Sequence, residues 1–171
     1  MTGRIFLFGD SIDTDQLAPG QYMKGGISEL AAHCLEGVRA DFAQRAGTGD
    51  LIVAGSNFGL GSSREQAAEA LRYLGISAVI AKSFGGIFYR NAINLGLPVL
   101  IAKDITLVND GDRAELDIER AQLSICISDA YEHRLTISLQ PIASNIQQIL
   151  SDGGLVAHLK KRFESERAEN K

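Results

Sequence analysis

Residues 55–65, with the sequence GSNFGLGSSRE, combine side chains that could bind an anion and accept a proton. They include three glycines, the hydroxyls of Ser62 and Ser63, and the guanidinium of Arg64. A planar guanidinium suits a carboxylate or phosphate, and the free backbone N–H groups at a helix N-terminus attract the same anions. We therefore predict a carboxylate or phosphate site in this stretch.

The flanking residues predict a strand before this stretch and a helix after it. Residues 51–54 form a short apolar run typical of a buried strand, and residues 64–74 have a helical pattern that Gly75 ends. Ser62 and Ser63 each precede a Glu or Gln by three positions, which is the spacing of a capping box. A helix cap is therefore an alternative role for either serine.

The rest of the chain predicts an α/β fold. The strand at 77–81 completes a βαβ unit, and a second unit follows in which Ser83 and Phe84 precede a helix over 87–95, so two helix N-termini could converge on one site. Further predicted strands cover 5–8, 99–102, 114–118, 122–127 and 134–139, and further predicted helices cover 27–35, 144–150 and 155–163. Since no linker divides these elements, we predict a single domain over 1–163 and a charged, frayed tail over 164–171.

Composition excludes several classes of protein. The chain has 171 residues, 45% of them hydrophobic, which is long enough for one domain with a sizeable core. A net charge of −4 and the lack of a basic stripe argue against nucleic acid as a partner. No apolar run approaches the roughly 20 residues that span a bilayer. We expect a cytoplasmic protein without a membrane partner.

The two cysteines do not form a metal-binding motif. Cys34 and Cys126 are far apart in the sequence, and neither belongs to a Cys-x-x-Cys pair. Cys34 falls on the apolar face of the predicted helix over 27–35, so we predict that it lies in the core. We expect this chain to bind no metal.

Motifs that the glycine-rich stretch superficially resembles fail at decisive positions. In a Gly-x-Gly-x-x-Gly reading that starts at Gly59, Arg64 occupies the third glycine position. A phosphate-binding P-loop requires a lysine after its last glycine, but Gly61 is followed by two serines. The aspartates of residues 9–15 lack the spacing of a calcium loop. A Gly-x-Ser-x-Gly nucleophile motif is absent from the sequence.

Three motifs, in order, carry a resemblance to a known family. They are GDSIDTD over 9–15 with a following Pro-Gly, NFGLGSSRE over 57–65, and SF at 83–84 with IFYRNAINLGLP over 87–98. This set resembles the small subunits of isopropylmalate and homoaconitate dehydratases, and equally the swivelling C-terminal domain of aconitase. The resemblance covers nearly the whole chain and implies a three-layer β/β/α swivelling domain.

The resemblance also implies a reaction and a partner. The chain would be the small subunit of a hydro-lyase acting on a 2-hydroxy di- or tricarboxylate, and the large subunit would carry a [4Fe-4S] cluster whose open iron is a Lewis acid. The first interpretation is 3-isopropylmalate dehydratase, which converts 2-isopropylmalate to 3-isopropylmalate in leucine biosynthesis. The alternatives are homoaconitate, 2,3-dimethylmalate, citramalate and maleate or malate hydro-lyases. An anion-binding or regulatory module is the non-enzymatic alternative.

Residue-for-residue matching to the family assigns roles to the glycine-rich stretch. Ser62 matches the catalytic base, Arg64 the arginine that binds a substrate carboxylate, and Ser63 a further hydrogen-bonding group. A serine hydroxyl is a very weak base, so it requires surroundings that stabilise its alkoxide, such as helix N–H groups and an arginine.

The aspartate-rich loop matches a segment that approaches this serine in the family. Its candidate substrate-binding residues are Asp13 and Thr14, and Asp15 is the candidate for a catalytic role, as a proton relay or an orienting group. The alternative is that Asp13 and Asp15 only brace the turn.

The segment after Pro19 matches the family loop that meets the variable part of the substrate. Lys24 would suit a substrate with a further polar end if it points inward. If it points outward, Tyr22 and Met23 would form an apolar wall suited to isopropylmalate. The sequence departs from commoner family forms at Leu60, Gln66 and Gly86.

Overall fold

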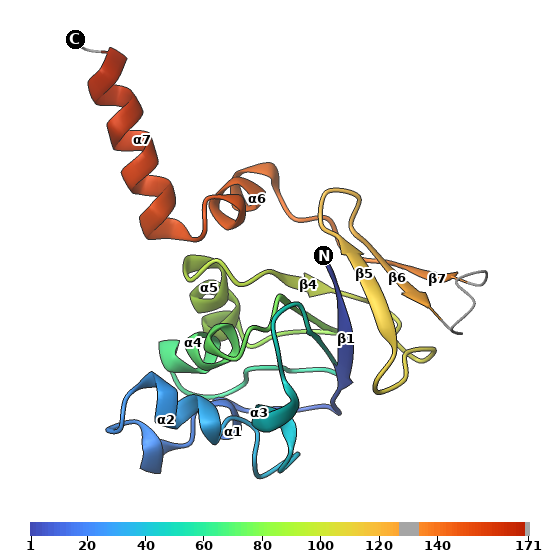
Figure 1. The fold of residues 1–171 in the computed structure, drawn as a ribbon. Helices are drawn as coiled ribbons and strands as arrows, with labels where there is room; N and C mark the ends of the chain where they lie inside the picture. The colour runs from blue at the N-terminus through green and yellow to red at the C-terminus, as the bar shows by residue number, and fades with distance from the viewer. Residues whose placement is uncertain (127–133, 170–171) are drawn as a thin grey trace.

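A computed structural model describes residues 1–126 and 134–169, and its strands form one seven-stranded sheet in the order β4-β3-β2-β1-β5-β6-β7 (Figure 1). The strands are β1 (Thr2–Leu7), β2 (Leu51–Ala54), β3 (Ala78–Ala81), β4 (Val99–Ile101), β5 (Arg113–Asp117), β6 (Gln122–Cys126) and β7 (Arg134–Ser138). Strands β1 to β4 are parallel neighbours, whereas β5 to β7 pair antiparallel. Both halves were predicted, although Ile127 of the sixth predicted strand lies outside the described residues.

The helices lie mainly on one side of the parallel half (Figure 1). They are α1 (Thr14–Leu17), the 3₁₀ helix η1 (Gly20–Tyr22), α2 (Ile27–Ala32), α3 (Phe42–Arg45), α4 (Glu65–Tyr73), α5 (Gly86–Asn94), α6 (Ser144–Ser151) and α7 (Leu155–Glu169). The predicted helices are present, and α7 continues six residues beyond its predicted end. The short elements α1, η1 and α3 were not predicted.

Alternate residues of the parallel strands serve two separate cores. In β2, Ile52 packs with the helices, whereas Leu51 and Val53 pack against the antiparallel strands. All residues of β2 and β3 are buried because both faces of this half of the sheet are covered. Cys34 lies in the core on the helical side with no exposed area, as predicted.

The sheet curls until its two edges meet. Ala102, just after β4, forms an antiparallel bridge with Leu139, just after β7, and the N–H of Gln140 donates to the carbonyl of Ile101 at 2.8 Å. The antiparallel half therefore folds over the face of the parallel half opposite the helices. Helices, parallel strands and antiparallel strands make three layers, which confirms the predicted β/β/α arrangement.

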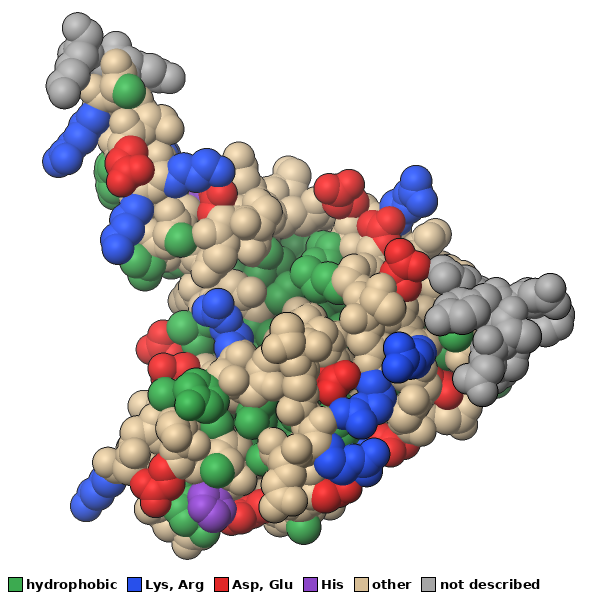
Figure 2. All heavy atoms as spheres, in the orientation of Figure 1, with side chains coloured by type: hydrophobic (Ala, Val, Ile, Leu, Met, Phe, Trp, Pro, Cys, Tyr) green, Lys and Arg blue, Asp and Glu red, His purple; other side chains and the backbone are tan. Residues whose placement is uncertain are grey.

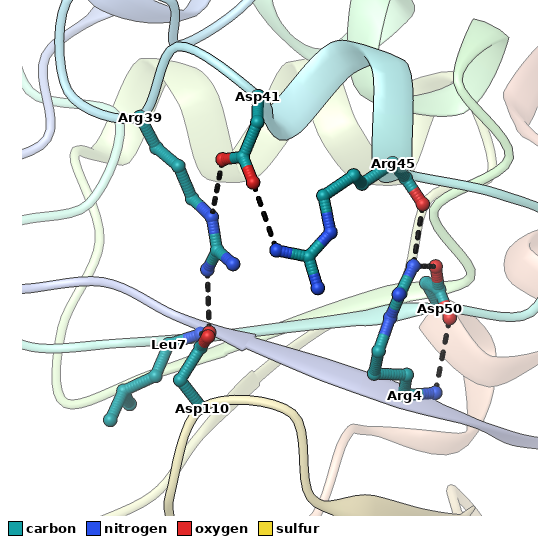
Figure 3. A network of polar contacts seen from close by, with 7 residues as sticks. All are labelled: Arg4, Leu7, Arg39, Asp41, Arg45, Asp50 and Asp110. Carbon is teal, nitrogen blue, oxygen red and sulfur yellow. Dashed lines mark hydrogen bonds and ion pairs between the residues drawn. The ribbon is translucent and has the colours of Figure 1, made fainter.

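A network of ion pairs ties this framework together beside β1 (Figure 3). The Arg39 guanidinium donates to Asp110 at 2.6 Å and to Asp41 at 3.1 Å, and it lies over the Phe6 ring. Arg4 donates to Asp50 at 3.0 Å. The network joins the segment before α3 to β1 and to the loop before β5.

A cleft of about 830 Å³ lies under α6, at the edge where the parallel strands begin. Its apolar lining includes Ile76, Pro98, Ile118 and Leu150, and Figure 2 shows hydrophobic side chains in this hollow. Helix α7 projects away from the body beyond it (Figure 1). Among the helices described, none is both long and apolar enough to cross a membrane.

Candidate active site

The loops that follow β1 and β2 are joined by backbone hydrogen bonds at the carboxyl edge of the parallel strands. The N–H of Ser11 donates to Ser56 at 2.7 Å, the N–H of Gly59 to Ile12 at 2.7 Å, and the N–H of Thr14 to Leu60 at 2.8 Å. Loops at this edge of a parallel sheet commonly form ligand sites. The aspartate-rich loop and the glycine-rich stretch therefore form one surface.

The loop after β3 joins the same surface. The N–H of Phe58 donates to the carbonyl of Ser83 at 3.0 Å, and the N–H of Gly85 donates back to Phe58 at 2.8 Å. The Ser83 hydroxyl also accepts from the N–H of Asn57 at 2.8 Å. These contacts place the loop that leads to α4 against the beginning of α5.

Glycine is required where the loops cross. Gly59 has φ +74°, and a Cβ there would lie 2.2 Å from Cγ of Phe88. At Gly55, a Cβ would lie 2.0 Å from Oδ1 of Asp10, the atom that accepts a hydrogen bond from the N–H of Ser56 at 2.6 Å. The close approach of the loops therefore explains two of the three glycines, and Asp10 holds the turn.

The alternative role of Ser62 or Ser63 as a helix cap is not found at the start of α4. Arg64 occupies the N-cap position, and no side chain caps the helix there. The N–H of Arg64 turns back to the carbonyl of Ser62 at 2.8 Å, so the helix begins only at Glu65. Both Ser62 and Ser63 are exposed and are free of a capping role.

The Ser62 hydroxyl lies 3.3 Å from the hydroxyl of Thr14, the first residue of α1. Thr14 is only 1% exposed. A Cβ at Gly61, which has φ +116°, would lie 2.9 Å from the Thr14 hydroxyl oxygen. Thr14 is therefore placed to orient Ser62 from beneath, and its burial leaves little surface for the substrate contact that the sequence suggested.

The Arg64 guanidinium is held by two acceptors on the α1 segment. Its Nη1 group donates to the carbonyl of Ala18 at 2.9 Å and forms an ion pair with Asp15. Within the described chain, Nε and Nη2 make no hydrogen bond. Because both contacts use one nitrogen, the opposite edge of the guanidinium is available for a bidentate carboxylate.

Asp13 has a role that the sequence suggested only as an alternative. Its carboxylate accepts from the N–H of Gln16 at 2.8 Å, and the Gln16 side chain accepts from the N–H of Asp13 at 2.9 Å. This capping box begins α1 and fixes the positions of Thr14 and Asp15. Asp13 braces the turn, whereas Asp15 contacts Arg64.

The predicted substrate-selecting residues follow Gly20, where a Cβ would lie 3.9 Å from Arg64 Nη2. The Tyr22 ring stacks on the His33 imidazole, with ring centroids 3.6 Å apart, and Met23 is 36% exposed. Lys24 is also exposed and has no hydrogen bond or ion pair to any residue that the structure describes. Sequence reasoning missed His33, because a stacking contact across eleven residues leaves no local pattern.

The donor groups in the described part of the chain do not fit an iron–sulfur cluster. No group of three or more His, Cys, Asp or Glu side chains in the described ranges could hold a metal ion. Burial raises the pKa of the Cys34 thiol and so disfavours the thiolate that metal binding requires. Cys126 lies in β6, in the antiparallel layer.

Comparisons with known proteins agree with the fold and the motifs. Residues 30–104 match the family described as the aconitase C-terminal domain. The chain is 47% identical to the 3-isopropylmalate dehydratase small subunit 1 of Thermotoga maritima, over 93% of this chain and 94% of that protein. It is 46% identical to the methanogen homoaconitase small subunit of Methanothermobacter thermautotrophicus, over 95% of this chain and 92% of that protein.

A solved structure extends the similarity to three dimensions. The crystal structure of 3-isopropylmalate dehydratase from Methanocaldococcus jannaschii matches this fold with a TM-score of 0.89 and 44% sequence identity. The match covers 98% of each chain. Motifs, layers and full-length similarity agree, and the chain belongs to the aconitase-related family of isopropylmalate and homoaconitate dehydratase small subunits.

Proposed function

We propose that this chain is the small subunit of a heteromeric hydro-lyase, 3-isopropylmalate dehydratase, and that it supplies the base and one carboxylate-binding group. The observation that carries the proposal is the exposed Ser62 hydroxyl beside an Arg64 guanidinium that its own chain already orients. The large subunit is the required partner, and the cytoplasm is the proposed location.

The reaction requires a proton to leave a carbon next to a carboxylate while a hydroxide departs. We assign the proton transfer to Ser62. The Thr14 hydroxyl lies 3.3 Å from the Ser62 hydroxyl and orients it. We assign one substrate carboxylate to the free edge of Arg64. A carboxylate at this position would be fixed close to Ser62, which is the positioning that efficient proton abstraction needs.

Asp15 acts in this proposal by orienting Arg64. It is the exposed member of the ion pair, with 67% of its side chain accessible, whereas Arg64 is 22% accessible. The [4Fe-4S] cluster belongs to the large subunit in this proposal, where it supplies Lewis-acid chemistry for the departing hydroxyl. Residues of this chain would bind, orient and deprotonate the substrate.

Sequence identity does not select the substrate. The relatives named for isopropylmalate and for homoaconitate are 47% and 46% identical to this chain. Tyr22 packs against the helical core and Met23 is exposed beside it, which favours the apolar isopropyl group. Homoaconitate is the second candidate, because the exposed Lys24 ammonium could bind an additional carboxylate.

Reconstitution with the large subunit tests the proposal. The two chains would be co-expressed, the cluster rebuilt without oxygen, and isopropylmalate, homocitrate, citramalate, dimethylmalate and malate assayed. We expect isopropylmalate to have the highest kcat/KM. Failure to turn over any of these acids, with tight binding of phosphate by the isolated chain, would favour an anion-binding module instead.

Two neighbouring serines provide a matched pair of variants. Ser62→Ala should leave assembly intact and lower kcat by at least ~10²-fold, the lower range for loss of a general base. Ser63→Ala removes the hydroxyl of another exposed serine from the same loop and should act mainly on KM. Near-normal turnover by Ser62→Ala would refute the assignment of the base.

A further inference from the structure

His33 forms a platform for the segment that follows Pro19. The Tyr22 and His33 rings are nearly parallel, with an interplanar angle of 8° and centroids 3.6 Å apart. Tyr22 is the only half-buried residue of the segment 20–26, and the other six residues are exposed. Its ring is therefore the point at which this otherwise exposed segment is attached to the body.

The platform itself is held in place by side-chain and backbone contacts. His33 Nδ1 lies in hydrogen-bond contact with Glu36 at 2.6 Å. His33 is the C-cap residue of α2, and its N–H donates to the carbonyl of Leu30 at 3.2 Å. Two residues later, the N–H of Leu35 donates to the carbonyl of Gln16 at 2.8 Å, in α1.

The residues at the start of this segment lie next to Arg64, which we assign to a substrate carboxylate. The carbonyl of Ala18 accepts from Arg64, and a Cβ at Gly20 would lie 3.9 Å from Arg64 Nη2, on the free edge of the guanidinium. Met23 and Lys24 follow within four residues, and both are exposed. The orientation of Tyr22 thus determines where these two side chains lie relative to that edge.

We infer that His33 is a positioning residue for substrate selection, because its stacking on Tyr22 fixes the segment that the proposed function assigns to the variable substituent of a 2-hydroxy acid. This inference rests on the proposed function. His33 does not contact the reacting atoms in this arrangement. Its loss should change which substituent is accepted, while the Ser62 and Arg64 geometry is retained.

Steady-state kinetics of the reconstituted enzyme test the inference with three variants. His33→Ala should raise KM for the preferred substrate about threefold to tenfold, the range for loss of an aromatic stacking contact, and change kcat less than about twofold. It should also change the ratio of kcat/KM between isopropylmalate and homocitrate. His33→Phe keeps an aromatic ring, so its KM and its substrate ratio should be close to those of the wild type. Glu36→Gln should change KM less than His33→Ala does.

Proton NMR of the small subunit tests the stack without turnover. Stacking on Tyr22 should shift the His33 ring protons upfield, and Tyr22→Leu should remove that shift. His33→Phe identifies the signal among those of the three histidines in the sequence. Thermal unfolding of each variant checks that the fold persists.

The outcomes separate this inference from the proposed function. An unchanged KM and substrate ratio in His33→Ala, with normal turnover, would refute the positioning role and leave the hydro-lyase assignment intact. A missing upfield shift in the wild-type subunit would also refute it. If wild-type enzyme turns over none of the acids, the proposed function fails and the role of His33 fails with it.

Discussion

The hydroxyl oxygens of Thr14 and Ser62 lie 3.3 Å apart, although the residues are separated by 48 positions in the sequence. Thr14 is buried and Ser62 is exposed, so the pair connects the protein interior to the surface where a substrate would bind. Either hydroxyl can donate to the other. In the proposed reaction, Thr14 would then donate to the alkoxide that forms when Ser62 loses its proton.

Thr14→Val tests this pair, because it removes the hydroxyl and keeps the β-branched shape. We expect kcat to fall about tenfold, within the effect of losing one hydrogen bond to a developing charge, and KM to change little. Thr14→Ser keeps the hydroxyl and is the matched control, with kcat close to that of the wild type. Equal kcat values in both variants would show that the Thr14 hydroxyl has no part in the reaction.

The composition of this site was predictable, but its geometry was not. The motifs placed Ser62, Arg64 and Asp15 together correctly, since their loops follow adjacent parallel strands. Helix α1 was missed because four residues are too few to show an apolar period. Its capping box at Asp13 buries Thr14 and turns Asp15 toward Arg64, and this arrangement depends on contacts between segments that are distant in sequence.

Arg64 and Asp15 should affect substrate binding more than turnover. Arg64→Lys removes the planar fork and should raise KM about tenfold to a hundredfold, because lysine cannot form a bidentate contact. Asp15→Asn keeps the shape but weakens the orientation of the guanidinium, and it should raise KM about twofold to fivefold, as expected for an exposed ion pair. Initial-rate measurements separate KM from kcat. A large loss of kcat in Asp15→Asn would instead indicate proton relay.

In the fold, too, local sequence patterns identified the strands but not the contacts between distant segments. Apolar runs identified β2 and β3 because both faces of these strands are buried. The change to alternating strands also identified the antiparallel half. The closure between Ala102 and Leu139 could not be predicted, because no local pattern specifies which sheet edges meet.

Two glycines provide a matched test of the loop crossing. Gly59→Ala places a methyl group against Phe88 at a residue with positive φ, and it should lower the free energy of unfolding by about 2–5 kcal/mol. Gly86 is the first residue of α5, and a Cβ there would have nothing within 4 Å, so Gly86→Ala should raise the free energy of unfolding by about 0.4–1 kcal/mol. Denaturant unfolding measures both. Equal stabilities would contradict the close packing at Gly59.

The Arg39 network should make the fold sensitive to acid. The hydrogen bond from Arg39 holds the pKa of Asp110 below its usual range, and that from Arg45 lowers the pKa of Asp41. In the unfolded chain an aspartate takes up a proton near pH 4, at a higher pH than in the fold. The stabilisation is therefore complete above that pH and is lost as the pH falls toward the lowered pKa values.

Asp110→Asn tests this pH dependence. At pH 7 we expect Tm to fall by at most about 3 °C, since the carboxylate is partly exposed, and the difference from wild type should shrink at pH 3. The control is Glu119→Gln, which removes the same charge from an exposed side chain that makes no ion pair within residues 1–126 and 134–169. Circular dichroism at several pH values gives Tm. A difference that stays constant down to pH 3 would exclude the ion-pair explanation.

Leu60 lies in the same loop as Ser62, at the carboxyl edge of the parallel strands, and is 49% exposed. Ile87, in the first turn of α5, is 37% exposed. A Cβ at Gly85 would lie 3.2 Å from Leu60 Cα, so the beginning of α5 and the Leu60 backbone are in close contact. In the proposed function the large subunit completes the site, so it would cover the face that carries Ser62. Large apolar side chains on the face that carries Ser62 are suited to such an interface.

Leu60→Asp should therefore weaken association with the large subunit about tenfold or more, because a charge would be buried at the contact. The stability of the isolated subunit should change little, since the side chain is already exposed. Val156→Asp is the control, because Val156 is 66% exposed on the projecting helix α7 (Figure 1). Titration of the labelled small subunit with its partner gives both dissociation constants. Selective weakening by Leu60→Asp would place the interface over Ser62, whereas an unchanged dissociation constant for Leu60→Asp would place it elsewhere.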